Sequence, residues 1–276
     1  MSTQQVEQSR ENWNNLAAGY DAFVTHTEGW LAHEGLLRAG VKPGERFLDV
    51  AAGCGGLSLP AARLGAHVLA TDWAPAMIER LESRARAEGL ANLDTRVMDC
   101  HALNLADGAF DVCGSQFGVM LVPDQPGALR EMVRVTRRGG RVLLIAYGSP
   151  AEIEFLHFFA AALQAVNPRF TGVPMDPPPL EFQVSDPVVL RERLIAAGLT
   201  DVVVDTVNER VELRSGQEMW DWVLNGNPIP GMLIADLSSQ QRTDMRAVLD
   251  GMLRERAGGG GTAVLTNPVH IGVGTK

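Results

Sequence analysis

Three aspartates stand at or just after the ends of short apolar segments in the first half of the chain. They are Asp49, Asp72 and Asp99, which belong to or follow the segments Arg46–Val50, Val68–Thr71 and Asp94–Met98. Carboxylates accept hydrogen bonds from ribose hydroxyls and from ammonium groups. If the segments are parallel strands, their carboxyl ends meet at one edge of a sheet, where open α/β sheets bind their ligands. The spacing therefore predicts one ligand site with three carboxylates.

A glycine-rich turn, LDVAAGCGG at Leu48–Gly56, contains the first of these aspartates. Glycine lets the backbone approach a ligand closely, although such a turn can also serve only to pack a strand on a helix. The dinucleotide fingerprint needs glycine at three positions, and here Ser58 stands at the third. Asp49 would also repel a pyrophosphate. It suits a ligand with an ammonium group and a sulfonium, and S-adenosylmethionine has both, together with a ribose diol for Asp72.

The elements that must position these residues alternate between strands and helices. Apolar runs predict seven strands, at Arg46–Val50, Val68–Thr71, Asp94–Met98, Phe110–Ser115, Arg141–Tyr147, Asp201–Val207 and Ala263–Val273. Helical spacing predicts helices near residues 8–40, after the glycine turn, from Pro75, and at Gln125–Thr136, Ala151–Val166, Val188–Ala197, Gln217–Leu224 and Ser239–Arg256. This alternation is typical of an α/β fold with a parallel sheet and helices on both faces.

The composition narrows the classes of partner. With 276 residues and a formal net charge of −9, the chain is acidic, which disfavours nucleic acid, and we interpret the basic residues of Arg80–Arg86 and Arg134–Arg141 as solvated helix faces. Cys54, Cys100 and Cys113 match no zinc or redox spacing and the six histidines are scattered, so we expect no metal. No apolar stretch has membrane-spanning length and the N-terminus lacks a signal-like run, so we expect a cytoplasmic protein.

Five segments follow one another in a characteristic order within about residues 10–150. They are LDVAAGCGG, VLATDWAPAMIERL, VMDCHALNLADGAFDVC, GVMLVPD and REMVRVTRRGGRVLLI. As an ordered set they resemble the class I S-adenosylmethionine-dependent methyltransferases, in particular the small-molecule group similar to the ubiquinone/menaquinone C-methyltransferases. The resemblance implies a Rossmann-like sheet of seven strands, mostly parallel with the last one antiparallel, and S-adenosylmethionine as the cofactor.

The resemblance also assigns roles to residues by position. The cofactor-binding set that it implies is Tyr20, Asp49, Ala51, Gly53, Gly55, Asp72, Trp73, Met77, Asp99, Cys100, His101, Gln116 and Phe117. In the family pattern Asp72 holds the ribose hydroxyls, and Trp73 and Met77 lie against the adenine. Asp99 accepts from the adenine amino group, and Tyr20 folds over the cofactor. Ala51 and Arg138 depart from the pattern, which often has glycine and proline there. The change at Ala51 is tolerated, and the change at Arg138 affects only a turn.

The segments after Tyr147 are expected to choose the methyl acceptor. We divide the chain into a helical cap, the cofactor-binding core, a helical and Pro-rich lid, and a part that completes the sheet, at residues 1–40, 41–150, 151–187 and 188–276. The helix at Ala151–Val166 is apolar nearly all round. With the Pro-rich stretch and Trp220–Trp222, it predicts a partly apolar pocket for a small-molecule acceptor, although the same helix could serve only as core.

The mechanism expected is an in-line displacement at a sulfonium, which needs alignment more than it needs a base. A base is required only where the acceptor must lose a proton. The candidates are Tyr20, His26, His33, His101 and His157, and we favour His157 because it lies on the apolar helix. The alternatives are a methyltransferase acting on a macromolecule, a non-catalytic nucleoside-binding protein, and an NAD-type protein. The acceptor atom (oxygen, nitrogen, carbon or sulfur) and the choice between monomer and homodimer stay open.

Overall fold

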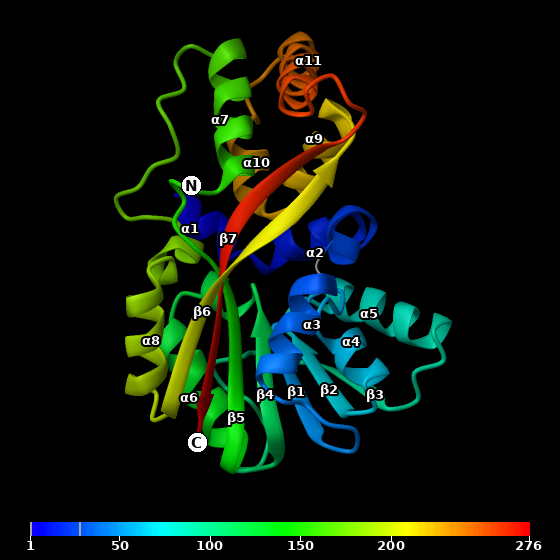
Figure 1. Ribbon diagram of the computed structural model, residues 1–276, viewed down its shortest axis with the longest axis vertical. Coiled ribbons are helices and arrows are strands. Elements are labelled where there is room, and N and C mark those ends of the chain that lie inside the picture. Colours follow the sequence, from blue (N-terminus) through cyan, green and yellow to red (C-terminus); the bar gives the residue numbers. More distant parts are fainter. Residues whose placement is uncertain (1, 28) are drawn as a thin grey trace.

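The chain folds around a seven-stranded sheet (Figure 1). The computed structural model describes residues 2–27 and 29–276. The strands are β1 (Arg46–Val50), β2 (His67–Asp72), β3 (Leu93–Val97), β4 (Phe110–Gln116), β5 (Thr136–Tyr147), β6 (Thr200–Leu213) and β7 (Ala263–Thr275). Their order is β3-β2-β1-β4-β5-β7-β6, with β1 to β5 parallel and β7 antiparallel to both of its neighbours. The predicted fold class is confirmed, including the antiparallel last strand.

Helices cover both faces of the sheet, with α3, α4 and α5 on one side and α6 and α8 on the other (Figure 1). The helices are α1 (Thr3–Glu7), α2 (Arg10–Gly19), η1 (Tyr20–Val24), η2 (Thr25–Thr27), α3 (Gly29–Arg38), α4 (Ser58–Arg63), α5 (Pro75–Ala87), η3 (Val119–Leu121), α6 (Gln125–Val135), α7 (Glu154–Val166), η4 (Leu180–Val184), α8 (Pro187–Ala196), α9 (Gly216–Gly226), α10 (Pro228–Leu233) and α11 (Ser239–Arg256). Gly35 brings α3 close to the sheet, since a Cβ there would lie 2.7 Å from Ile145 Cδ1.

The central strands are buried on both faces, which explains why their sequences are continuous apolar runs rather than alternating ones. Fully buried members include Phe47, Leu48, Val112, Val142, Leu143 and Ile145. One of the bounds that differ from the prediction lies between α6 and β5. Helix α6 ends at Val135 and β5 begins at the next residue, because Thr136 pairs with Phe110. Gly139, predicted to end the helix, instead lies within the strand with a φ of 68°.

Strands β6 and β7 extend beyond the sheet and carry a second core. β5 pairs with β7 only over Val269–Thr275, whereas β6 pairs with β7 from Ala263 onward. The extra residues form a two-stranded ribbon that reaches α7, α9 and α11 (Figure 1). A two-stranded ribbon is marginal alone, so apolar side chains of the helices stabilise it. This second core includes Phe159, Leu163, Val211, Leu213, Met219, Trp220, Met245, Leu249 and Leu265.

The N-terminal segment links the sheet to this second core. The predicted helical stretch over residues 8–40 is interrupted, and α2 packs on α5 and α9 while η1 packs on α9. Two short helices that the sequence did not predict, α1 and α10, pack on each other. Ser2 and Gln5 form a capping box at the start of α1. Within the described residues, no helix combines the length and apolar character needed to cross a bilayer.

Candidate functional site

The turn after β1 carries three residues in the left-handed region of backbone space. Ala51, Gly53 and Gly55 have φ angles of 55°, 53° and 95°. For Ala51 this conformation costs about 1–2 kcal/mol. Gly118 leaves room for it, since a Cβ on Gly118 would lie 2.5 Å from the Ala51 carbonyl oxygen. Gly55 instead packs against α5, because a Cβ on Gly55 would lie 2.3 Å from Leu81 Cδ1.

Asp49 and Asp72 lie at the ends of neighbouring strands, and both are buried. Asp72 accepts hydrogen bonds from the backbone N–H of Gly53 at 2.9 Å and of Ala74 at 2.8 Å, so it fixes the glycine turn and the start of α5. Asp49 accepts from the Ser58 hydroxyl. Ser58, at the third fingerprint position, therefore supplies a donor that glycine lacks.

The electrostatics of this pair favour a positively charged ligand. Burial raises the pKa of Asp49 to about 7, and the charge of Asp72 adds to that effect. Burial also raises the pKa of Asp72, although backbone N–H groups oppose the rise. One oxygen of Asp49 is buried and has no hydrogen-bond partner among the described residues. An unpaired buried carboxylate oxygen is costly, so a ligand cation here would stabilise the site.

The third strand end carries Asp99, Cys100 and His101. Asp99 accepts from the backbone N–H of His101 at 2.9 Å and lies 2.8 Å from its ring Nδ1. Burial raises the pKa of Asp99, but these contacts outweigh it and hold the pKa below its usual value. The three side chains form the one group of potential metal ligands among the described residues. Burial raises the pKa of the Cys100 thiol to about 12.

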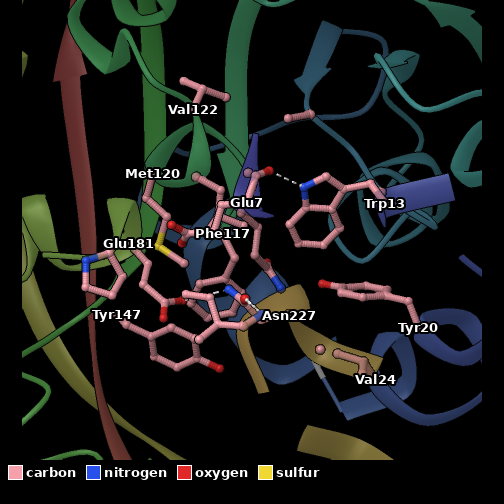
Figure 2. Close-up of a pocket in the computed structure, with 18 of the residues that line it drawn as sticks. Glu7, Trp13, Tyr20, Val24, Phe117, Met120, Val122, Tyr147, Glu181 and Asn227 are labelled. Carbon is pink, nitrogen blue, oxygen red and sulfur yellow. Dashed lines mark hydrogen bonds between the residues drawn. The ribbon is translucent and has the colours of Figure 1, made fainter. Parts of the chain in front are cut away.

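A cavity of about 560 Å³ runs from these strand ends toward the second core. Its volume is typical of small-molecule sites. Its walls contain every member of the predicted cofactor-binding set except Gly55, namely Tyr20, Asp49, Ala51, Gly53, Asp72, Trp73, Met77, Asp99, Cys100, His101, Gln116 and Phe117. The structure therefore brings these residues together, and their individual roles stay predictions. Figure 2 shows part of the wall.

Aromatic rings lead from the end of β4 into the second core. Phe117 stacks on Tyr147 with ring centroids 4.4 Å apart. Tyr147 and Phe155 pack edge to face with centroids 5.7 Å apart, and Phe155 and Trp222 do so at 4.9 Å. All four rings line the cavity, together with Phe159, Phe170, Val173, Met175, Pro179 and Phe182. Helix α7, the Pro-rich stretch and α9 thus meet around one apolar chamber. Trp220, predicted to join it, packs in the second core instead.

A second pair of carboxylates lies in the same wall, and the sequence interpretation missed both. Glu7 is 1% exposed and accepts from the Leu180 N–H at 3.1 Å. Glu181 accepts from Asn227 Nδ2 at 3.3 Å (Figure 2). Burial raises the pKa of Glu7 to about 7 and that of Glu181 to about 8, with the charge of Glu7 adding to the second rise. No local pattern could reveal them, because one lies in the polar N-terminus and the other in a Pro-rich stretch.

The structure separates the candidate bases into two groups. His101 and His157 line the cavity. His26 and His33 are exposed and lie outside the cavity wall. Tyr20 lines the cavity above the glycine turn, where a Cβ on Gly53 would lie 3.9 Å from the Tyr20 ring. The position of Tyr20 fits the predicted role of folding over a ligand held by that turn.

Comparison with known proteins identifies the class. Residues 48–144 match the Methyltransferase domain family. The chain is 41% identical to an uncharacterized protein of Mycobacterium tuberculosis over 51% of this chain and 49% of that protein, so it spans about half that relative's length. It is 33% identical to the ubiquinone/menaquinone biosynthesis C-methyltransferase UbiE of Bdellovibrio bacteriovorus over 59% of this chain and 72% of that protein. The YcgJ protein of Bacillus subtilis shares the fold, with a TM-score of 0.57 and 16% identity over 91% of this chain and 98% of that one.

The chain belongs to the class I S-adenosylmethionine-dependent methyltransferases. The cofactor of this class is S-adenosylmethionine, and the residues at the strand ends fit it. Asp49 lines the cavity, and its buried, unpartnered oxygen matches the need for an ammonium group. Asp72 retains acceptor capacity for ribose hydroxyls beside its two backbone donors.

Proposed function

We propose that the protein transfers the methyl group of S-adenosylmethionine to a small, partly apolar acceptor and releases S-adenosylhomocysteine. One observation carries this proposal. The cavity is continuous from the carboxylates at the ends of β1 and β2 to the aromatic chamber under α7 and α9. A cofactor held at the first end would therefore present its reactive group toward an acceptor held at the second.

In this proposal the chain's own residues bind and align. Asp72 accepts from the ribose hydroxyls, and Asp49 pairs with the ammonium group. Trp73 and Met77 cover the adenine, while Asp99 accepts from its amino group. When bound, the cofactor supplies a methyl group on a good leaving group, so alignment accounts for most of the rate, up to about 7–11 kcal/mol in favourable cases.

The acceptor side supports a small molecule. The chamber is enclosed by α7, the Pro-rich stretch and α9, and we propose that residues 151–187 act as its lid. Two relatives are named as methyltransferases of ubiquinone/menaquinone biosynthesis, which act on carbon. Of the described residues that line the cavity, none is lysine or arginine, which disfavours a phosphate-rich polymer as acceptor.

The test is incubation of the protein with methyl-labelled S-adenosylmethionine and a native metabolite extract, followed by identification of labelled products. We expect label in a small organic molecule and equimolar S-adenosylhomocysteine. Label in the protein or nucleic-acid fraction would instead establish a macromolecular acceptor. Tight cofactor binding without any labelled product would indicate a non-catalytic binding protein.

The lid is tested separately by hydrogen exchange. We expect exchange over residues 151–187 to slow when S-adenosylhomocysteine and an acceptor analogue are both present, because the chamber closes on its occupant. Unchanged exchange in this segment under saturating ligands would contradict the lid.

A further inference from the structure

Glu7, Glu181 and Asn227 form an acidic cluster at the acceptor end of the cavity. α1, η4 and the residue before α10 bring the three together (Figure 2). Asn227 Nδ2 lies 3.3 Å from Glu181 Oε2, and the Leu180 N–H donates to Glu7 Oε2. The second oxygen of Glu7 is buried and has no hydrogen-bond partner among the described residues.

The cluster belongs to the acceptor end because of its neighbours. Gln125 donates both to the Met120 carbonyl in η3, the short helix after β4, and to the Leu180 carbonyl beside Glu181. Met120 follows Phe117, whose ring stacks on Tyr147. The acidic cluster therefore adjoins the aromatic chamber, and it is distinct from Asp49 and Asp72 at the glycine turn.

The charges of the cluster are not balanced by the protein. Burial acts on both carboxylates, backbone N–H groups and the Asn227 amide act on Glu7, and the Asn227 amide and the charge of Glu7 act on Glu181. Two carboxylates that share a buried site repel, and each disfavours the charged form of the other. Burial adds a desolvation cost that neutral donors offset only in part. A ligand cation would remove both costs.

The chemistry around the cluster selects the kind of cation. The Asn227 side-chain oxygen accepts from the Ile229 N–H at the start of α10, so its amide nitrogen is the end that faces Glu181. A metal ion would need oxygen ligands in that position, whereas an N–H donor leaves only part of the coordination sphere available. The neighbouring rings of Phe117, Tyr147 and Phe155 offer faces on which an organic cation gains cation–π stabilisation.

We propose that the acceptor is an apolar or aromatic molecule with a protonated amine, and that Glu7 and Glu181 bind this ammonium group while the aromatic chamber holds the rest. This inference rests on the proposed function, because it names the acceptor class of the same cavity. The inference excludes acceptors that would place a carboxylate or phosphate group, rather than an ammonium group, against Glu7 and Glu181.

The test compares matched ligands that differ only in one terminal group. Tryptamine, tryptophol and indolepropionate form one set, and the phenyl and naphthyl counterparts form two more. Binding is measured by calorimetry on the protein saturated with S-adenosylhomocysteine. We expect the amine of a set to bind at least about tenfold more tightly than the alcohol, and the acid to bind most weakly. Equal or tighter binding of the alcohol or the acid overturns the inference, as does absence of binding by all three amines at about 5 mM.

Two variants assign the preference to the cluster. Glu181→Gln and Glu7→Gln each keep the shape and remove one charge. We expect each to lower amine affinity about tenfold or more, to leave alcohol affinity unchanged and to strengthen binding of the acid. A merely structural role would weaken all three ligands in parallel, and that outcome contradicts the inference. Glu255→Gln, at an exposed position on α11, is the matched control and should change none of them.

The same titrations separate this inference from the proposed function. If the protein fails to bind S-adenosylhomocysteine at all, the proposed function fails. If S-adenosylhomocysteine binds normally and the amine preference is absent, only the acceptor class is wrong. If one glutamine variant does not fold, the other variant and the ligand series on the unaltered chain still test whether the cluster binds an ammonium group.

Discussion

The two ends of the cavity hold their carboxylates in different ways. At the cofactor end, Asp72 is bonded by the N–H groups of Gly53 and Ala74, which belong to the turn and helix beside its own strand. At the acceptor end, Glu7 is bonded by Leu180, which is 173 positions away in the sequence. The first arrangement follows from local geometry at neighbouring strand ends, whereas the second exists only once the N-terminus, η4 and α10 have packed together.

This difference shows that the two ends of the cavity depend on different parts of the fold. The ends of β1 and β2 are fixed by the sheet register, so the cofactor end depends on the first core. The aromatic chamber depends on the ribbon of β6 and β7 and on the second core. We therefore expect the two ends to respond separately to mutation, and the predictions below test that separation.

The largest effect is expected from a cavity in the second core. Leu249 on α11 is fully buried there, and Leu249→Ala should lower the free energy of unfolding by about 2–5 kcal/mol. Urea unfolding followed by tryptophan fluorescence measures this loss, and hydrogen exchange should rise first in α7, α9 and α11. Cofactor affinity should change little in the folded variant.

The matched control for that variant is Leu143→Ala, which makes the same truncation at an equally buried position of the first core. It should loosen the sheet and weaken cofactor binding. If the two variants lower stability and cofactor affinity in the same proportion, the two cores are a single cooperative unit and the comparison between the ends is wrong.

The next effect concerns the cofactor end. Asp72→Ala removes the acceptor that we assign to the ribose and also releases the N–H groups of Gly53 and Ala74. Each lost charge-assisted hydrogen bond is worth about 1.5–3 kcal/mol, so we expect S-adenosylmethionine affinity to fall by about ten- to hundredfold. Calorimetry measures it. Unchanged affinity would contradict the assignment, and Asp236→Ala, at an exposed position, should leave affinity unaltered.

A third effect concerns the pH dependence of stability caused by Glu209, a buried carboxylate that lies outside the cavity and so cannot contact a ligand there. Glu209 on β6 is 3% exposed, receives a hydrogen bond from Asn267, and lies outside the cavity wall. Burial raises its pKa from 4.5 to about 7. Since the folded pKa exceeds the unfolded one, the stability that this group contributes is fully present below pH 4.5 and is lost as the pH rises through about 7.

Glu209→Gln removes this titration. We expect the variant to be more stable than the unaltered protein at alkaline pH by about 1–2 kcal/mol, and to lose the advantage toward acid pH. Thermal unfolding at several pH values checks it, with and without S-adenosylhomocysteine. An advantage that stays constant with pH would show that Glu209 does not titrate in this range.

The sequence predicted which residues gather at the ends of β1 to β4, and it predicted the acceptor end only in outline, for physical reasons. A glycine turn and aspartates at strand ends can be recognised from residues that lie close together in the sequence. The bounds of β1 and α11 also agree with the prediction. The lengths of β6 and β7 were underestimated because the ribbon beyond the sheet depends on helices that follow much later in the chain. Glu7, Glu181 and Asn227 could not be found, since no local spacing relates them. Gly55 was predicted to bind the ligand because its turn matched the family pattern; it lies outside the cavity wall, and a Cβ on it would lie 2.3 Å from Leu81 Cδ1.

The smallest effect decides what Trp73 does. Its ring lines the cavity but also packs beside Ala17, Ala74 and Met77 in a small apolar cluster. If it stacks on adenine, Trp73→Ala should weaken S-adenosylmethionine binding by about 1 kcal/mol, and Trp73→Phe should restore most of the loss because the stacking face remains. If its role is packing alone, the alanine variant lowers the unfolding free energy while the affinity of the folded protein stays constant. Calorimetry and urea unfolding on the same preparations separate the two, and the second outcome would restrict recognition at the cofactor end to its carboxylates.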